Sequence, residues 1–307
     1  MHAFRFAVQM DSAPNGGAWS MLARRVESMG YDVLVMPDHL GHQLSPFAAL
    51  AAAAAATTSL RVGAFVFAND YRHPLMLARE GATLDYLSGG RFEMALGAGW
   101  MTSDYRAMGL TYGPASARVD RLEEAVPIIK RLLAGETVTH HGPNYDLDRA
   151  YAGVPPVQRP RAPLAIGAGG PRMLRLAARE ADIVGLTPGF SERGWPLFGQ
   201  ATENATRDKL AVVREAAGDR FEDLEINLWV SSAGLVGSGN SLLGSARAAT
   251  VKAATSLYGS PYVLYGTLKG VRDQLLRRRD SLGISYYTFP GRSMETMAPL
   301  VEALSGQ

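Results

Sequence analysis

Residues 164–186, LAIGAGGPRMLRLAAREADIVGL, contain a strand, a helix and a second strand in close succession. The apolar runs Leu164–Gly167 and Ile183–Leu186 are short and bounded by turn residues, which is typical of buried strands. Between them, Arg172–Arg179 has the spacing of an amphipathic helix and follows two glycines and a proline. This β-α-β pattern predicts a parallel sheet with helices packed against it.

The same alternation of short apolar runs and helical segments continues along the chain and gives eight units. The predicted strands are Phe4–Met10, Val33–Met36, Arg61–Phe67, Phe92–Leu96, Leu164–Gly167, Ile183–Leu186, Ile226–Val236 and Ile284–Phe289. The predicted helices are Ala18–Met29, Phe47–Thr57, Pro74–Leu87, Ala115–Leu133, Arg172–Arg179, Thr202–Ala217, Ser245–Tyr258, Leu268–Leu282 and Met294–Leu304. Eight strands with following helices favour an α/β fold of the (β/α)8 TIM-barrel type, because an open doubly wound sheet usually has fewer strands.

We expect a single domain over residues 1–307, with insertions after strands four and six. Residues 137–163 are too long for a simple loop, and the turn sequence Gly142–Tyr145 within them predicts a small hairpin. A second insertion is expected within residues 187–222. The chain has no internal repeat beyond these units and no low-complexity linker that would divide it.

Composition excludes several classes of function. The 47% apolar and 20% charged residues are those of a globular protein, and the formal net charge is only +2, with Lys and Arg dispersed along the chain. Nucleic acid and anionic membrane are therefore not expected partners. The absence of cysteine removes disulfides, thiolate catalysis and iron–sulfur clusters. The N-terminus lacks the pattern of a secretory signal, so we expect a cytoplasmic protein.

In a barrel of this class the active site is built from the loops that follow the strands. Four such loops carry residues of chemical interest: Met36–His39 (MPDH), Ala68–Asp70 (AND), Gly97–Trp100 (GAGW) and Gly167–Arg172 (GAGGPR). We expect the functional residues to come from these four loops, because the carboxyl ends of the strands meet at one face of the barrel.

The glycine-rich loop after the fifth strand opens a helix. Backbone N–H groups of Gly169 and Gly170 and the positive end of the helix can hold a phosphate, and Arg172 can pair with the same anion. The alternative is that the glycines serve only the sharp turn from strand to helix. The pattern alone leaves both interpretations open.

His39 lies at the end of the second strand and can transfer a proton near neutral pH, with Asp38 beside it. The alternative is a packed, hydrogen-bonded histidine without a catalytic role. His39 with His42, and the pair His140–His141, lack further ligands at zinc spacing, so no metal site is expected.

Other charged residues are expected to be structural. The chain has four lysines, Lys130, Lys209, Lys252 and Lys269, all in predicted helices or at a helix start, so no Schiff-base lysine is expected at the barrel mouth. Asp85, Arg91 and Glu93 flank the entrance to the fourth strand at the opposite, stabilising face, which predicts a structural salt bridge among them.

The segments PDH (37–39), RHP (72–74), LDYLSGGRFEMALGAGW (84–100) and IGAGGPRMLRLAAREAD (166–182) occur in this order along the chain. With them the sequence resembles the bacterial luciferase-like monooxygenase superfamily, and most of all its deazaflavin (coenzyme F-420) dependent oxidoreductases. The resemblance extends over essentially the whole chain. It implies a luciferase-like TIM barrel that binds its cofactor at the C-terminal face, in a homodimer.

The resemblance also implies roles for individual residues. Asp38 would bond to the deazaflavin and His39 would act as general acid or base beside its ring. A non-prolyl cis peptide would fall at Phe65–Val66, behind the ring. The remaining implied cofactor contacts are Ala68, Ala98, Gly99 and Ser103 for the ring and its side chain, and Gly169, Gly170, Arg172 and Met173 for the phosphate.

At two positions the sequence differs from the sugar-phosphate dehydrogenases of this group. Trp100 stands where those enzymes have a glutamate, and Gln43 stands where they have a tryptophan. Glucose 6-phosphate is therefore not the expected substrate.

The predicted function is hydride transfer between deazaflavin C5 and a small organic molecule, with His39 moving the accompanying proton. An FMN-dependent two-component monooxygenase of the same fold is the first alternative. From another class, a non-redox phosphate-binding barrel, such as an isomerase or lyase, remains open, as does a barrel that binds a ligand without catalysis.

Overall fold

Eight strand positions form a closed parallel barrel in the computed structural model, which describes residues 2–189, 197–235 and 259–307. The barrel strands are β1 (Arg5–Gln9), β2 (Val33–Met36), β3 (Arg61–Ala64) continued by β4 (Phe67–Ala68), β5 (Phe92–Gly97), β8 (Leu164–Ala168), β9 (Ile183–Leu186), β10 (Glu225–Trp229) and β13 (Ile284–Pro290). β1 pairs with β13, and the ring closes because β3 and β4 both pair with β5. The predicted TIM barrel is confirmed.

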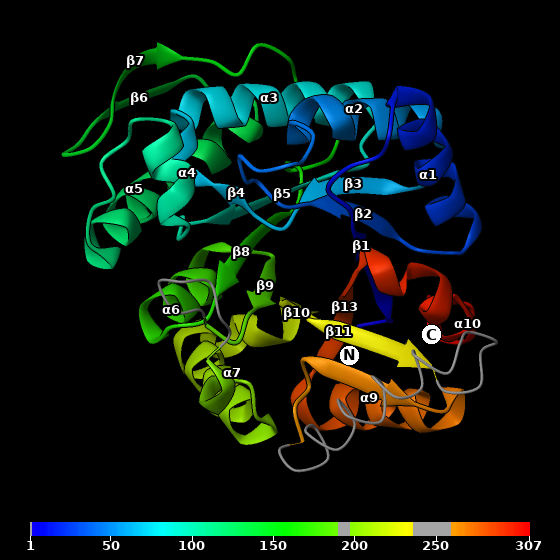
Figure 1. The fold of residues 1–307 in the computed structure, drawn as a ribbon. Helices are drawn as coiled ribbons and strands as arrows, with labels where there is room; N and C mark the ends of the chain where they lie inside the picture. The colour runs from blue at the N-terminus through cyan, green and yellow to red at the C-terminus, as the bar shows by residue number, and fades with distance from the viewer. Residues whose placement is uncertain (1, 190–196, 236–258) are drawn as a thin grey trace.

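Helices cover the outside of the strands (Figure 1). They are α1 (Gly16–Ser28), α2 (Pro46–Ala56), α3 (Pro74–Leu87), α4 (Thr102–Ala107), α5 (Ala115–Leu133), α6 (Pro171–Glu180), α7 (Glu203–Ala217), α9 (Leu268–Leu282) and α10 (Met294–Leu304), with short 3-10 turns η1 (Asn69–Tyr71), η2 (Phe198–Gln200), η3 (Gly218–Asp223) and η4 (Gly291–Ser293). Side chains of Asn15, Thr202 and Thr267 cap the first turns of α1, α7 and α9. The predicted helix Ser245–Tyr258 lies outside the described residues, and α4 was not predicted.

The predicted strand Ile226–Val236 is wrong in one respect, because the chain leaves the barrel within it. β10 ends at Trp229, and β11 (Ser232–Leu235) pairs in parallel with β12 (Val263–Gly266) in a separate two-stranded sheet. Both the backbone N–H and the side chain of Ser231 donate to the carbonyl of Tyr262. Ser231 therefore bonds to the neighbouring segment just beyond the end of the barrel strand.

The hairpin predicted within residues 137–163 is present as β6 (Val138–His141) and antiparallel β7 (Asp146–Ala150). It follows α5 and runs along that helix (Figure 1). Much of the segment 187–222, where a second insertion was expected, is the barrel helix α7 itself.

A compact cluster of buried side chains, among them Ala7, Val35, Ala95, Ala165 and Tyr286, packs inside the barrel. A larger apolar core lies between the strands and the surrounding helices. Such layers of side chains make the barrel a packed core rather than a pore.

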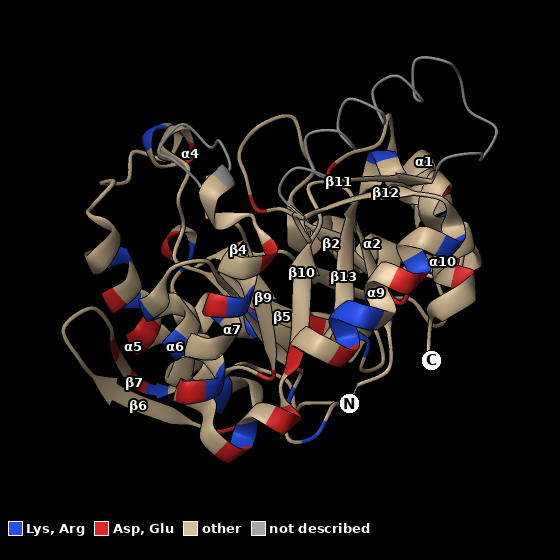
Figure 2. Ribbon diagram, turned by 90° about the horizontal axis from the view of Figure 1, so that it is seen from below, with Lys and Arg blue, Asp and Glu red and all other residues tan. Residues whose placement is uncertain are grey.

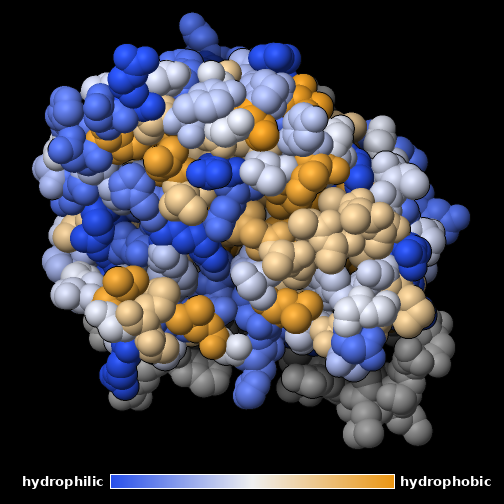
Figure 3. Space-filling model, turned by 90° about the horizontal axis from the view of Figure 1, so that it is seen from above, coloured by the Kyte–Doolittle hydropathy of each residue, from blue (hydrophilic) through white to orange (hydrophobic). Residues whose placement is uncertain are grey.

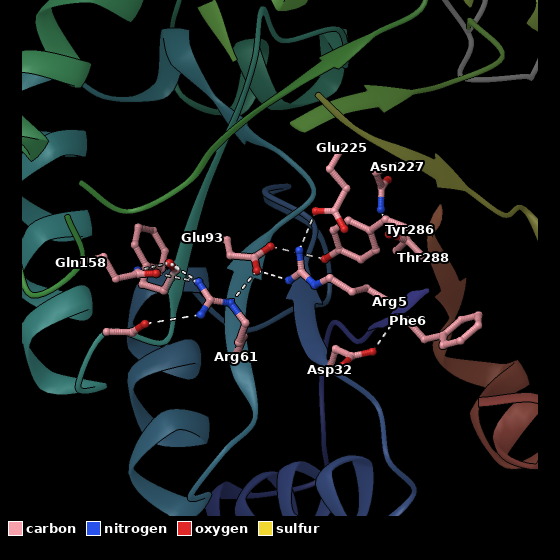
Figure 4. Close-up of polar contacts among 12 residues, drawn as sticks. Arg5, Phe6, Asp32, Arg61, Glu93, Gln158, Glu225, Asn227, Tyr286 and Thr288 are labelled. Carbon is pink, nitrogen blue, oxygen red and sulfur yellow. Dashed lines mark hydrogen bonds and ion pairs between the residues drawn. The ribbon is translucent and has the colours of Figure 1, made fainter. Parts of the chain in front are cut away.

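The amino-terminal end of the barrel is closed by charged side chains (Figure 4). Arg5 pairs with Glu93 and, at 2.6 Å, with Glu225, and Arg61 pairs with Glu93 at 2.6 Å. The expectation that Glu93 is structural agrees with this position, but its predicted partner was wrong.

Arg91 and Asp85 have partners of other kinds. Arg91 donates to the carbonyls of Ala54 and Leu60, and Asp85 accepts from Gln158 at 2.7 Å. The predicted ion pair among Asp85, Arg91 and Glu93 therefore does not form, because each side chain reaches a different neighbouring element.

Positive and negative side chains are interspersed along the outer helices rather than gathered into a field of one sign (Figure 2). Within the described part of the chain, no helix is both long and apolar enough to cross a bilayer.

Candidate active site

The third strand is interrupted at the carboxyl-terminal mouth of the barrel. Between β3 and β4 the peptide Phe65–Val66 is cis, at the bond where the resemblance placed it. The side chains of both residues pack against glycines of the neighbouring strands. A Cβ at Gly97 would lie 2.5 Å from Val66 Cγ2, one at Gly167 would lie 3.0 Å from Val66 Cγ1, and one at Gly185 would lie 2.8 Å from Phe65 Cε2. Three strands thus have glycine where the interruption needs space.

His39 is held by a buried carboxylate. Its Nδ1 lies 2.7 Å from Oδ2 of Asp104, which is only 4% exposed and also accepts a hydrogen bond from the hydroxyl of Tyr71 at 3.0 Å. Asp104 fixes the ring through Nδ1, so Nε2 is the nitrogen left to exchange a proton with a ligand. The rings of Trp100 and His39 lie nearly perpendicular to each other, with centroids 5.5 Å apart.

Tyr71 stays a neutral hydrogen-bond donor in this arrangement. Burial, together with the adjacent Asp104 carboxylate, raises the pKa of Tyr71 above its usual range. Asp104 therefore receives one bond from a neutral hydroxyl and one from the imidazole, which is the geometry of a carboxylate that orients a histidine.

Asp38 is engaged with the protein itself. Its two oxygens accept from the guanidinium of Arg72 at 2.7 and 3.1 Å, and Oδ2 also accepts from the backbone N–H of Ala68 at 3.0 Å. Asp38 thus ties the loop after β2 to the chain just beyond the Phe65–Val66 bond. A direct bond from Asp38 to a cofactor stays a prediction.

The loop after β5 carries Ala98, Gly99 and Ser103. Gly99 has φ +76°, and a Cβ there would collide with the hydroxyl of Tyr105. The short helix α4 then leaves Ser103 exposed and turns Asp104 inward towards His39. Gly99 thus allows the left-handed backbone turn that leads into α4 at the barrel mouth.

The glycine-rich loop leads into α6 as predicted. Gly170 is the N-cap of α6 and provides no capping side chain, and Met173 is half-buried in the first turn. Arg172 points to α5 instead, where its guanidinium lies 2.5 Å from Asp120 and 2.6 Å from Glu123. Phosphate binding by Arg172, which stays a prediction, would require it to exchange these partners.

A model of the luciferase-like monooxygenase family matches residues 2–237. The chain belongs to this family. An F-420-dependent glucose-6-phosphate dehydrogenase of Microbacterium testaceum is 33% identical over 204 residues, which are 62% of this chain and 60% of that protein. A 4-hydroxyprotoasukamycin monooxygenase of Streptomyces nodosus subsp. asukaensis is 35% identical over 164 residues, 52% of this chain and 43% of that protein.

Solved structures agree in fold with this luciferase-like protein over nearly the whole chain. An F-420-dependent secondary alcohol dehydrogenase, solved with an F-420–acetone adduct, has a TM-score of 0.77 at 16% identity, covering 98% of this chain and 99% of the other. The F-420-dependent tetrahydromethanopterin reductase of Methanopyrus kandleri has a TM-score of 0.74 at 18% identity, covering 98% and 99%. At these identities the likeness is one of fold.

Sequence reasoning missed three residues that build the site of this luciferase-like protein. Asp104, Tyr71 and Arg72 hold His39 and Asp38, yet none was expected to do so. Asp104 follows the strand-four loop by four positions and Tyr71 follows the strand-three loop by one. A search for carboxylates in these loops that could orient His39 would have found Asp104.

One of the four lysines, within the predicted helix Thr202–Ala217, reaches a loop of the barrel mouth. Lys209 of α7 reaches the loop after β9, where its Nζ donates to the carbonyls of Thr187 at 2.7 Å and Gln200 at 3.1 Å. Burial lowers the pKa of Lys209 to about 8. A lysine thus reaches a mouth loop, but it bonds to two backbone carbonyls there.

Proposed function

We propose that this chain is a coenzyme F-420-dependent oxidoreductase that transfers a hydride between the deazaflavin and a small carbonyl, alcohol or activated alkene. One observation carries the proposal: the imidazole of His39, held at Nδ1 by Asp104, stands at the same barrel mouth as the Phe65–Val66 interruption. The matched relatives named as F-420-dependent dehydrogenases support it. The matches span about 60% of the first relatives' length.

The mouth has features that suit a planar ring with a phosphate tail. Small residues stand at the ends of two strands on one side, since Ala68 ends β4 and Ala98 and Gly99 follow β5. On the other side a Cβ at Gly170 would meet no atom within 4 Å, so backbone there is open to a ligand. The first-turn N–H groups of α6, which no side chain caps, suit a phosphate.

The protein's own residues would manage the proton and the orientation. When bound, the deazaflavin supplies or accepts the hydride at C5. Nε2 of His39 donates a proton to the substrate oxygen during reduction of a carbonyl and takes it back during oxidation of an alcohol. Asp104 keeps the imidazole in the tautomer with Nδ1–H, and Trp100 restricts its rotation.

A titration of the purified protein with coenzyme F-420 and with FMN, followed by fluorescence, tests the proposal. We expect saturable binding of F-420 and, in a second step, oxidation of reduced F-420 in the presence of a carbonyl compound. The absence of binding for both cofactors would contradict the proposal.

An FMN-dependent monooxygenase is the second candidate, and the 35% identity to 4-hydroxyprotoasukamycin monooxygenase favours it. The same mouth would hold the isoalloxazine ring and its single phosphate. Tighter binding of FMN than of F-420, with product formation that requires O2, would select this candidate.

We also propose a cytoplasmic homodimer that acts on a small molecule. A groove of about 220 Å³ lies between α2 and α3 on the face seen in Figure 3. Phe47, Met76 and Leu87 line it, and Leu87 is 66% exposed. Sedimentation of the wild type and of Leu87→Glu tests this interface, and we expect the variant to shift to monomer. A wild type that sediments as a monomer would exclude the dimer.

A further inference from the structure

The charges around His39 are neutralised within the protein. Asp38 is paired with Arg72, and the Asp104 carboxylate contacts His39 itself. A third acid of this region, Asp70, accepts from Arg121 at 2.9 and 2.5 Å. Each of these three acids therefore has a partner within the protein, either an arginine or the imidazole of His39.

The buried Arg118 of α5 and the half-buried Gln43 of the loop after β2 also have internal partners. Arg118 donates to the carbonyl of Gly99 at 3.1 Å and to that of Gly113. The amide of Gln43 donates to the carbonyl of Pro37 at 2.8 Å. Among the described residues of the loops after β2, β4 and β5, no buried or half-buried arginine or lysine is left without a partner for an anionic substrate.

The rim of these loops is apolar instead. Leu40 directly follows His39 and is 51% exposed, and Leu44 on the same loop is 37% exposed. Leu110, on the loop that follows α4, is 40% exposed. The indole of Trp100 packs against the imidazole in a T-shaped contact. Exposed leucines on the loop that carries His39 and on the loop that follows Asp104 of α4 indicate an apolar binding surface.

We infer that the substrate is an uncharged molecule with an apolar body, whose oxygen faces Nε2 of His39 while the body rests on Trp100 and the rim leucines Leu40, Leu44 and Leu110. The reaction in which it takes part rests on the proposed function. In the reducing direction, the C5–H bond of the reduced deazaflavin breaks, its electron pair forms a C–H bond at the carbonyl carbon, and a proton from His39 completes the alcohol. The substrate is reduced and the deazaflavin is oxidised.

A matched pair of ketones tests the inference. 4-tert-Butylcyclohexanone is uncharged, whereas 4-oxocyclohexanecarboxylate has the same ring and reactive carbonyl but carries an anion. Glucose 6-phosphate serves as the sugar-phosphate comparison. Saturation-transfer NMR with the cofactor-loaded protein measures ligand binding without turnover, and oxidation of reduced F-420 measures kcat/KM.

We expect the uncharged ketone to bind and react at least about tenfold better than its carboxylate analogue, because the anion would be desolvated without a cation to meet it. Stronger binding of the carboxylate or of glucose 6-phosphate would overturn the inference, as would equal binding of all three. Hydride transfer to the carboxylate analogue with a kcat/KM equal to or above that of the uncharged ketone would do so while leaving the proposed function intact. Preferential binding of the uncharged ketone without any hydride transfer would uphold the inference and overturn the proposed function.

Variants locate the apolar surface. Leu40→Asp places a charge beside His39, and we expect about a tenfold rise in KM for the uncharged ketone with cofactor binding unchanged. Met21→Asp is the matched control, since Met21 lies on α1 and is 63% exposed. An unchanged KM in Leu40→Asp, or an equal rise in both variants, would overturn the assignment of the rim.

Discussion

At the scale of single residues, the decisive contact is the one between His39 and Asp104. The carboxylate is 4% exposed and receives bonds from both His39 and Tyr71. We expect Asp104→Asn to lower kcat by about 10²-fold, because an amide oriented by Tyr71 cannot stabilise the imidazolium or enforce the Nδ1–H tautomer. Steady-state kinetics and cofactor titration check this, and cofactor affinity should stay within about twofold.

Two further variants distinguish the orientation of His39 by Asp104 from an unspecific loss of activity. Tyr71→Phe removes one neutral bond to Asp104 and should cost at most about tenfold in kcat. Asp146→Asn breaks the exposed pair of His141 and Asp146, whose atoms lie 2.5 Å apart, and should leave kcat unchanged. Wild-type kcat in Asp104→Asn would show that His39 works without its carboxylate.

Sequence reasoning placed His39 at the mouth because strand ends can be located from the pattern, and the strand ends define the mouth. The cis bond at Phe65–Val66 came from the resemblance to the family and not from the pattern. It did not reach Asp104 or Arg72, since their partners come from other loops. Pairings between loops depend on three-dimensional placement, which the spacing along one loop does not encode. For the same reason, the orientation of Arg172 towards α5 could not be foreseen.

At the scale of elements, the β6–β7 hairpin depends on one carboxylate of α5. Glu124 accepts from the backbone N–H groups of Asn144 and Tyr145 at 3.0 Å and from His140 at 2.9 Å. Tyr145 in turn accepts from Asn69 at the strand-three loop. The hairpin thus links the outside of the barrel to the mouth.

We expect Glu124→Gln to loosen this hairpin by about 1–3 kcal/mol, because the amide NH2 then faces N–H donors that need an acceptor. Hydrogen exchange should become faster across residues 138–150 and stay unchanged in β8. Glu136→Gln, which breaks an exposed pair with Arg131, is the control and should change neither region. Uniformly faster exchange throughout the barrel would contradict a local role.

Two errors in the predicted elements, the missing α4 and the joining of β10 with β11, have physical explanations. α4 has six residues, which is too short for a helical period to be distinguished from a loop. β10 and β11 were joined because both are apolar, and the serines between them are compatible with a strand until the partner segment is known. Periodicity therefore located long elements well, and it failed where tertiary contacts end an element.

At the scale of the whole molecule, the alternation of eight units was enough to predict a closed barrel, since each unit buries its strand under its own helix. That residues 1–307 act as one domain stays a prediction. The charge arrangement at the amino-terminal end was less accessible: Arg5, Arg61, Glu93 and Glu225 come from four different strands. At this end of the barrel the side chains form an ion-pair network where an apolar layer would otherwise be expected (Figure 4).

This network gives the folded state a dependence on pH that can be measured. Burial raises the pKa of Glu225 to about 7, opposed by Arg5 and assisted by the nearby Glu93 carboxylate. In Glu93 the two arginines outweigh burial and lower its pKa. Between the unfolded pKa of about 4.5 and about 7, the folded chain retains a proton at Glu225 that the unfolded chain releases. Glu225 therefore lowers the free energy of unfolding as pH rises through this window, by about 3 kcal/mol in all.

We expect Glu225→Gln to remove most of this loss, since the amide holds no titrating proton. Urea unfolding at several pH values between about 5 and 8 should give a flatter dependence for the variant than for the wild type. The exposed Glu222→Gln is the control and should keep the wild-type slope. Equal slopes in wild type and Glu225→Gln would mean that Glu225 is already ionised in the folded protein. Glu93 and Glu225 would then both be negatively charged beside Arg5. The positive charges of Arg5 and Arg61 together would have to neutralise them.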